Sequence, residues 1–185
     1  MKKYIIILKL FLLISCIFIF LVLMRVVNPA GSNTRRTRCV SNIGEISFAL
    51  SIYQGQYTGY FPDKSGDLGF KLIKSNVSDL KVFKCPKDKA KNLNGNSAFK
   101  SDYIYLGGFK KETTPPVPIV FDKINNHKDY CNVLFSNREL KRYEFQYSSY
   151  EKLIDHIIEQ KHYKKGMKDI LKTKVKEALV NNSKK

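Results

Sequence analysis

An apolar run near the N-terminus limits the possible folds more than any other part of this sequence. Residues 5–24 carry a single charge, at Lys9. As an α-helix, a run of this length covers roughly 30 Å, the thickness of the hydrocarbon core of a bilayer. A cleaved secretory signal has a shorter apolar region that ends in small residues, whereas Arg25 follows this run directly. We therefore expect residues 1–27 to form a retained transmembrane anchor.

A second interpretation of the same segment rests on Cys16. Residues 13–16, Leu-Ile-Ser-Cys, have the form of a bacterial lipobox, in which the cysteine is acylated and the lipid anchors the protein. The alternative is that Cys16 is a small residue inside a membrane helix. A lipoprotein turns polar directly after its cysteine, but here the apolar residues continue to residue 24. The sequence therefore favours the helix.

The segment after this run predicts a long amphipathic helix. Residues 28–34 contain Pro29 and Gly31 and predict a joint between the anchor and a folded body. From residue 35 to residue 57, apolar side chains recur every three or four positions, which places them on one face of a helix. The side chains of this predicted face are Val40, Ile43, Ile46, Leu50, Tyr53 and Tyr57.

Short strands are predicted downstream of this helix. Residues 103–106 and 118–121 are short runs of β-branched and aromatic residues bounded by Gly or Pro. Residues 131–147 predict a hairpin that turns near Asn137, and apolar and polar residues alternate in its second arm. The body, residues 28–147, is therefore predicted to be an α+β domain whose long helix packs on a small antiparallel sheet.

The C-terminal segment, residues 148–185, differs in composition from the body. It contains ten lysines against five acidic residues, and its apolar residues recur at helical spacing with a break expected at Gly166. We predict a basic helical extension. Its surface has two interpretations: it binds anionic lipid or a wall polymer, or its apolar faces pack on the body and leave the lysines in solvent.

The net charge of +17 raises the question of nucleic acid as a partner. Lysine and arginine supply non-specific affinity for phosphates. In this sequence the basic residues are spread along the whole chain, and an anchored, exported body does not meet DNA. Nucleic acid is therefore not an expected partner, and the membrane is.

Several motifs of the body occur in the order in which a known family carries them. Residues 38–43 read Arg-Cys-Val-Ser-Asn-Ile, residues 58–62 read Thr-Gly-Tyr-Phe-Pro, and residues 82–86 read Val-Phe-Lys-Cys-Pro. With these motifs the sequence resembles the bacterial type IV pilin-like and type II secretion pseudopilin-like proteins, most closely the prepilin-processing-associated subfamily with an H-x9-D-G motif. The motif positions are Ser41, Asn42, Tyr53, Gly59, Pro62, Pro86, His127 and Asn137.

The resemblance implies a pilin-like fold and a structural function. A protein of this kind would be a single-pass protein of the inner (cytoplasmic) membrane, with its N-terminus in the cytoplasm and its body outside. It would be a structural or accessory component of a type II secretion or type IV pilus-like apparatus, with other pilin-like subunits as partners.

Two departures from the family pattern are visible, and the first supports an alternative. No Gly precedes Gly31 and no Glu lies in the apolar run, where the family has the Gly of its leader cleavage site and the Glu of filament packing. Asn137-Arg138 stands where the family has Asp-Gly, and Arg138 would cost roughly 1 kcal/mol in such a turn. The alternative is a stand-alone anchored extracytoplasmic binding module that does not assemble into filaments.

Cys39 and Cys85 are candidates for a disulfide. In an oxidising compartment, a bridge across a loop of this length would stabilise the fold by on the order of 4 kcal/mol in the chain-entropy model. The alternative is a pair of reduced thiols, because spacing alone does not show whether the two Cα atoms lie within about 6 Å.

Two sets of residues suggest a metal. Cys39, Cys85, Cys131 and His127 suffice in number for zinc, but the sequence lacks the local C-x2-C pair that structural zinc sites usually have. Oxygen ligands for calcium are offered by Asp122, Asn125, Asn126 and Asp129, and an ordinary Asx-rich turn explains them equally well. The sequence therefore predicts no cofactor, with calcium as the alternative.

Cys131 and His127 are also the residues that would suit nucleophilic catalysis. Nothing in the sequence supplies an orienting third group or an oxyanion site, and no Gly-rich phosphate loop, G-x-S-x-G or H-E-x-x-H motif occurs. His156 and His162 lie in the basic extension, where exposure to solvent is expected. We predict that the chain is not an enzyme and assign no catalytic residue.

Overall fold

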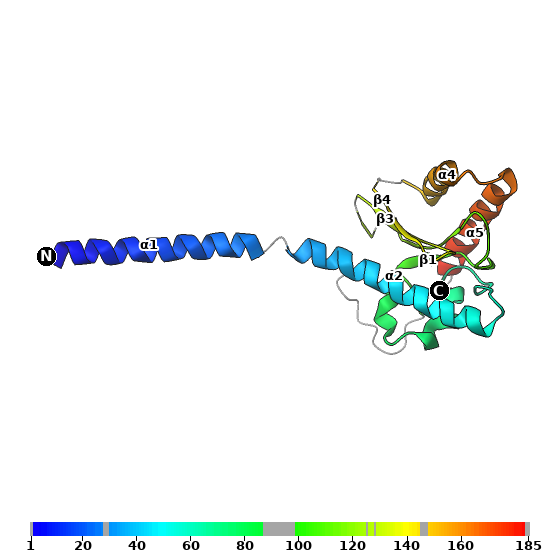
Figure 1. The fold of residues 1–185 in the computed structure, drawn as a ribbon, viewed down its shortest axis with the longest axis horizontal. Helices are drawn as coiled ribbons and strands as arrows, with labels where there is room; N and C mark the ends of the chain where they lie inside the picture. The colour runs from blue at the N-terminus through cyan, green and yellow to red at the C-terminus, as the bar shows by residue number, and fades with distance from the viewer. Residues whose placement is uncertain are drawn as a thin grey trace. The chain divides into compact units, whose positions relative to one another are not determined.

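The computed structural model describes residues 2–27, 30–86, 99–124, 126–127, 129–144 and 148–183 (Figure 1). The chain divides into two compact units, residues 1–37 and residues 38–185, and each is considered by itself. Helix α1 (Lys2–Val27) lies in the first unit. Helix α2 (Ala30–Gln56) begins in the first unit and continues into the second.

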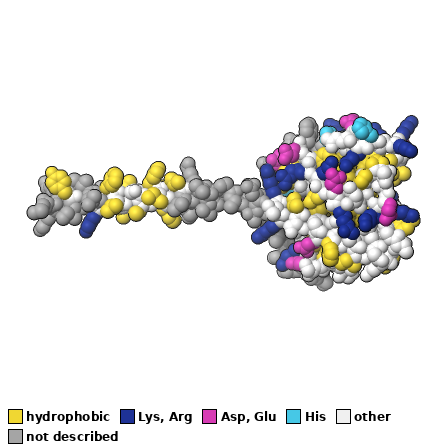
Figure 2. Space-filling model, in the orientation of Figure 1, with side chains coloured by type: hydrophobic (Ala, Val, Ile, Leu, Met, Phe, Trp, Pro, Cys, Tyr) yellow, Lys and Arg dark blue, Asp and Glu magenta, His cyan; other side chains and the backbone are white. Residues whose placement is uncertain are grey.

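Helix α1 carries exposed apolar side chains. The structure describes the side chains of Tyr4, Lys9 and residues 11–22 of this helix, and the large apolar ones among them are exposed (Figure 2). A membrane-spanning helix needs about 20 consecutive apolar residues. Across the described residues, no helix combines the length and the apolar character that crossing a membrane requires.

This finding corrects the expectations that involve a membrane. The transmembrane helix predicted for residues 1–27 is wrong, and so is the single-pass inner-membrane anchoring that depends on it. The prediction rested on the apolar composition of residues 5–24, and in the described part of the chain no helix carries that character over the length of a span.

The second unit is α+β, with helices around one antiparallel sheet (Figure 1). The sheet has the order β1-β2-β3-β4, and every neighbouring pair is antiparallel. Its strands are β1 (Tyr103–Tyr105), β2 (Pro118–Asp122), β3 (Cys131–Phe135) and β4 (Leu140–Tyr143). Besides α2, the helices are α3 (Asp67–Ile73), the 3-10 turns η1 (Lys74–Asn76) and η2 (Leu80–Phe83), α4 (Tyr150–Lys161) and α5 (Lys165–Ser183).

Helix α2 packs through side chains that recur every three or four residues. Cys39, Ile43, Ile46, Ala49 and Leu50 are buried. The centre of the predicted apolar face is therefore in the core, and the face continues one turn further towards the N-terminus, to Cys39. Tyr57, at the other end, is exposed.

Both faces of the sheet are covered, because alternate residues of a strand point to opposite sides. Phe121 of β2 packs against Tyr150 of α4, with ring centroids 5.8 Å apart. The next residue, Asp122, meets Cys39 of α2. Tyr103 of β1 also contacts Cys39. We call the two sides of the sheet the α4 face and the α2 face.

Strands β3 and β4 are joined by a tight loop at the predicted turn. The Arg138 N–H donates to the Phe135 carbonyl, and the Phe135 N–H donates to the Glu139 carbonyl, both at 2.9 Å. Arg138 has φ 68, a left-handed conformation that costs a non-glycine residue roughly 1 kcal/mol of conformational free energy. Asn137 instead accepts the Glu139 N–H through Oδ1, at 3.1 Å. This arrangement is a three-residue hairpin loop, which replaces the two-residue turn that Asp-Gly would favour.

The C-terminal helices pack on the body. Helix α4 ends at Lys161, where His162 adopts φ 53, and the expected break at Gly166 lies instead in the first turn of α5. The Asn182 side chain accepts the Asp67 N–H at 2.7 Å near the end of α5. The side chains that α4 and α5 add to the hydrophobic core include Leu153, Ile154, Ile157, Ile158, Leu171, Val175 and Ala178.

Candidate functional site

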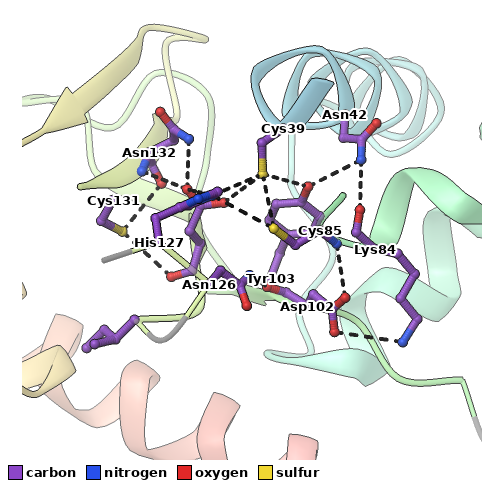
Figure 3. A network of polar contacts seen from close by, with 12 residues as sticks. Cys39, Asn42, Lys84, Cys85, Asp102, Tyr103, Asn126, His127, Cys131 and Asn132 are labelled. Carbon is purple, nitrogen blue, oxygen red and sulfur yellow. Dashed lines mark hydrogen bonds and ion pairs between the residues drawn. The ribbon is translucent and has the colours of Figure 1, made fainter. Parts of the chain in front are cut away.

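Three separate segments bring cysteine and histidine side chains together on the α2 face (Figure 3). Cys39 comes from α2, Cys85 from the turn after η2, and His127 from the segment between β2 and β3. The Cys39 Sγ lies 3.7 Å from the Cys85 Sγ and 3.3 Å from the His127 Nε2. The Cys85 Sγ lies 3.8 Å from the same nitrogen. We call these three residues the Cys39 cluster.

The Cys39 cluster is buried and has the composition of a metal site. Its side chains are at most 8% exposed, and their three ligand atoms lie within 4.8 Å of one another. Within the described part of the chain, this is the group of three or more Cys, His, Asp or Glu residues that can hold a metal ion. Sulfur and imidazole nitrogen are the ligands that zinc and other borderline-soft metals prefer.

Hydrogen bonds fix the segment that carries Cys85 against the helix that carries Cys39. The Asn42 side chain, one turn after Cys39 on α2, donates to the Lys84 carbonyl at 2.8 Å. The Cys85 N–H donates to Asp102 Oδ2 at 3.0 Å, and Asp102 also forms an ion pair with Lys84 at 3.8 Å. The backbone at Cys85 is therefore held from α2 on one side and from the residue before β1 on the other.

A buried carboxylate completes the surroundings of the cluster. Asp122, at the end of β2, accepts a hydrogen bond from the Cys39 thiol at 3.4 Å through Oδ1. Its Oδ2 lies 3.4 Å from the His127 Nε2 and accepts the N–H and the side-chain amide of Asn132, at 2.9 and 2.8 Å. A buried carboxylate is costly unless such donors surround it. Asp122 is therefore held by β3 and points its other oxygen at the cluster.

His127 is held by stacking as well as by polar contacts. Its ring stacks on Tyr130 with centroids 4.2 Å apart, and the Arg142 guanidinium lies over the Tyr130 ring at 5.0 Å. Burial alone would lower the pKa of His127, but the hydrogen bonds with Asp122 and Cys85 and the charge of Asp122 outweigh it and raise the pKa to about 9.

The Cys39 thiol is a poor nucleophile in this environment. The contact with Cys85, burial and the nearby charge of Asp122 together raise the pKa of Cys39 far above its ordinary value. Burial, followed by the effect of Cys39, raises the pKa of Tyr103, whose hydroxyl lies 3.3 Å from the Cys39 Sγ. Because the thiolate is the reactive form, these protonated groups are unsuited to nucleophilic chemistry.

Cys131 is separate from the cluster, although the zinc interpretation of the sequence includes it. Its thiol donates to the carbonyls of Asp122 and Asn132, at 3.6 and 3.7 Å. Burial raises its pKa well above the ordinary value. Cys39 and Cys85, the proposed disulfide partners, are present as free thiols whose sulfur atoms are in contact.

The residues considered for calcium do not form an oxygen cage in the described structure. Asp122 faces the Cys39 cluster, as described above. The Asn126 side-chain amide donates to the Asp102 carbonyl at 2.6 Å, and Asp129 is exposed. Asn125 lies outside the described residues.

The other family-motif positions have local structural contacts. Tyr53 stacks on Tyr57 at 4.1 Å, and Pro62 accepts the Tyr105 hydroxyl at 2.9 Å through its carbonyl. Gly59 has φ 83, a left-handed conformation in which glycine is favoured. Ser41 is exposed on α2, and Pro86 directly follows Cys85.

The histidines of the extension differ in their surroundings. His156 is half-buried, lies 2.8 Å from the Gln160 side chain, and meets the Tyr143 ring edge-on. His162 is exposed, as expected. Neither belongs to the Cys39 cluster.

Sequence reasoning missed the position of Asp122 and the contact of Tyr103. Tyr103 lies in a short predicted strand and Asp122 directly follows another. Because successive strand residues point to opposite faces of a sheet, the sequence could have assigned each side chain to one face or the other. Which face meets Cys39 depends on the pairing of distant segments, which no local pattern shows.

Comparisons with known proteins give no family for this chain. No family model matches the sequence, and the searches of curated proteins and of solved structures found no match. The resemblance to pilin-like proteins therefore stays a prediction.

Proposed function

We propose that this protein is a pilin-like or pseudopilin-like structural or accessory component of a type II secretion or type IV pilus-like apparatus. The observation that carries the proposal is the way α2 packs. The buried face of α2, from Cys39 to Leu50, lies against an antiparallel sheet, and Cys39 contacts Tyr103 and Asp122 of its strands. Such a helix suits a rigid building block, because its buried face fixes its position on the domain.

The state of the cysteines supports a structural function over an enzymatic one. Cys39, Cys85 and Cys131 are each at most 3% exposed. The thiol of Cys131 donates to the backbone carbonyls of Asp122 and Asn132 and not to His127. A catalytic cysteine needs an accessible thiolate and a base within reach, and this pair offers neither.

The exposed side chains of α1 support assembly with other subunits. Consecutive apolar residues from Phe11 to Ile14 and from Ile17 to Val22 are exposed, so they lie on every side of the helix. A helix that is apolar all round needs an apolar environment. We propose that the equivalent helices of further pilin-like subunits supply it. The stand-alone binding module remains the alternative, because the sequence lacks the family's leader Gly and filament Glu.

Binding of an anionic polymer by the C-terminal extension stays a prediction. Several lysines of the extension already form ion pairs with acidic residues of this chain, which leaves fewer of them for such a partner. Lys168 and Lys172 form ion pairs with Asp155 at 3.3 and 2.9 Å, and Lys161 pairs with Glu139 at 3.2 Å. Figure 2 shows acidic side chains interspersed with the basic ones on the visible face of the compact unit. The net charge alone therefore overstates how basic this surface is.

The proposed assembly is tested with Cys16, a natural probe that is exposed on α1. Cells that produce the chain at its native level are treated with a short bismaleimide, and crosslinked products are identified by mass spectrometry. We expect a product that joins Cys16 to a second copy or to another long-helix subunit. The buried Cys39, Cys85 and Cys131 should not react in the folded protein.

Two variants control the crosslinking experiment. Cys16→Ala should abolish the product, and adding Leu13→Cys to that variant should restore it, because Leu13 is exposed on the same helix. If both single-probe proteins stay uncrosslinked and sediment as a 21.4 kDa monomer, the assembly proposal is wrong and the stand-alone module is favoured.

A further inference from the structure

The distances within the Cys39 cluster match those of a tetrahedral metal centre. With metal–sulfur bonds of about 2.3 Å and metal–nitrogen bonds of about 2.0–2.1 Å, tetrahedral zinc separates two sulfurs by about 3.8 Å and sulfur from nitrogen by about 3.6 Å. The two sulfurs here are 3.7 Å apart, and the two sulfur–nitrogen distances, 3.3 and 3.8 Å, lie on either side of the ideal value.

Asp122 borders the cluster on one side. Its Oδ1 lies 3.4 Å from the Cys39 Sγ, and its Oδ2 lies 3.4 Å from the His127 Nε2. The ligand atoms that lie within 4.8 Å of one another belong to Cys39, Cys85 and His127, so the carboxylate contacts two of the ligands from outside this group.

The groups around these ligands are arranged to orient them. Asn132 donates twice to Asp122, and the Cys85 N–H is bonded to Asp102. The Tyr103 hydroxyl is positioned to donate to a thiolate at Cys39. Outer partners of this kind set the orientation and the basicity of metal ligands.

A disulfide explains less of the arrangement. It would use Cys39 and Cys85 and would require their sulfurs to approach to about 2.05 Å. It would not explain why His127 and Asp122 both contact the Cys39 sulfur. A metal ion uses the two sulfurs and the imidazole together, with Asp122 in contact with two of these ligands.

We propose that Cys39, Cys85 and His127 form a structural site for one zinc-class divalent ion, with the Asp122 carboxylate beside it. This goes beyond the proposed building-block function and does not depend on it. Binding displaces the thiol protons of Cys39 and Cys85 and the Nε2 proton of the His127 imidazolium, which leave to solvent, so the ion is held by two thiolates and a neutral imidazole. The bound ion joins α2, the turn after η2 and the β2–β3 segment.

The test uses the full chain, reduced and stripped of metal with a chelator, and titrated with Co²⁺. Tetrahedral thiolate ligation predicts a sulfur-to-cobalt charge-transfer band and intense d–d bands that saturate at one ion per chain. Zn²⁺ should displace the cobalt and remove the bands. Elemental analysis of the protein purified from cells without added metal should find zinc in the same ratio.

Matched cysteine variants separate ligation from general packing. Cys39→Ser and Cys85→Ser should each weaken the charge-transfer band and lower the affinity, while Cys131→Ser should keep both, since Cys131 is equally buried but lies outside the cluster. Asn132→Ala, which removes the side-chain amide donor to Asp122 without removing a ligand, should lower the affinity about 10–100-fold. Circular dichroism of each variant identifies any that fails to fold.

Three results would overturn the proposal. The first is a folded, reduced wild-type chain that gives no cobalt bands. The second is a band that persists unchanged in both Cys39→Ser and Cys85→Ser. The third is a Cys39–Cys85 disulfide in protein isolated from cells with its thiols blocked at lysis, since it would show that oxidation rather than metal binding occupies the pair.

Discussion

The two faces of the sheet are both buried, but they are built in different ways. On the α4 face, Phe121 packs against Tyr150 through apolar contact. One residue further along β2, Asp122 is enclosed on the α2 face by donors from Asn132 and by the Cys39 cluster. A single step along a strand thus separates a core held by apolar packing from one that depends on every polar group having a partner.

The buried cysteines differ in the same way, between apolar packing and polar contacts. Cys131 is a lone buried thiol on β3, and it behaves as a small core residue with backbone hydrogen bonds. Cys39 and Cys85 face each other, a histidine and a carboxylate. Equal burial therefore does not mean equal chemistry, and substitutions on the two faces should have different consequences.

The largest effect is expected on the α4 face. Phe121→Ala should lower the free energy of unfolding by about 4 kcal/mol, because it removes a fully buried ring and leaves a cavity against Tyr150. Urea denaturation followed by circular dichroism measures the change. The loss should be the same with a chelator and with Zn²⁺ present. A loss below about 1 kcal/mol would mean that this face is not a packed core.

The neighbouring substitution on the α2 face should cost slightly less and depend on conditions. In chelator, Asp122→Ala should lower the free energy of unfolding by about 3 kcal/mol, because it leaves His127 and the donors of Asn132 without their acceptor. In Zn²⁺ the difference from wild type should grow, because the variant loses the carboxylate that borders the ligands Cys39 and His127. An equal loss in both conditions would contradict the proposed difference between the faces.

A substitution on the solvent side of α2 should stabilise the protein without touching either face. Gly44 is exposed within the helix, and no atom lies within 4 Å of the position of an added Cβ. Gly44→Ala should raise the free energy of unfolding by about 0.5–1 kcal/mol, since alanine loses less backbone freedom on folding. Thermal unfolding measures the gain, and cobalt affinity should be unchanged. A destabilised Gly44→Ala protein would indicate an unseen contact on this side.

The smallest effect is expected at the surface of the C-terminal helices. Hydrogen bonds from Lys172 and Lys168 hold the pKa of Asp155 below its ordinary 3.8, although partial burial opposes them. A depressed folded-state pKa gives stability that is present above the unfolded-state pKa and is lost as the pH falls through the folded value.

Asp155→Asn should therefore cost at most about 1 kcal/mol near pH 7, because the pair is solvent-screened. The cost should begin to shrink as the pH falls below about 3.8 and should disappear only below the lower, folded-state pKa. Unfolding measured in urea at several pH values and in high salt checks this. A cost that stays constant with pH would assign the effect to packing instead of charge.

Local patterns in the sequence predict the helices and turns well, but not the partners of distant residues. The three-to-four spacing of Ile43, Ile46 and Leu50 gives the buried face of α2, and the tight loop lies at Asn137-Arg138 as the alternating strands indicate. The membrane anchor illustrates an error of the same method, since composition alone suggested a span that the described helices do not provide.

The Cys39 cluster could be predicted only in part. Cys39 and Cys85 stand out because cysteines are few, and the sequence suggests that they meet. Two facts exclude Cys131 from the cluster. Neighbouring residues of β3 point to opposite faces of the sheet, and the pairing of β2 with β3 places Asn132 beside Asp122, so Cys131 points to the other face. Such a result requires the register of the whole sheet, which is a property of tertiary structure.

The long spacing of the cluster residues also has a consequence for synthesis of the chain. Cys39 precedes His127 by 88 residues, so at about 5–20 residues per second the first thiol leaves the ribosome roughly 4–18 s before its histidine partner. Closing so large a loop is a late event in folding, because the entropy of the chain opposes it until neighbouring contacts exist. A newly made chain therefore passes through an interval in which its thiols are open to oxidation and to foreign metals. Rapid completion of the sheet around Asp122 ends that interval and encloses the sulfur atoms.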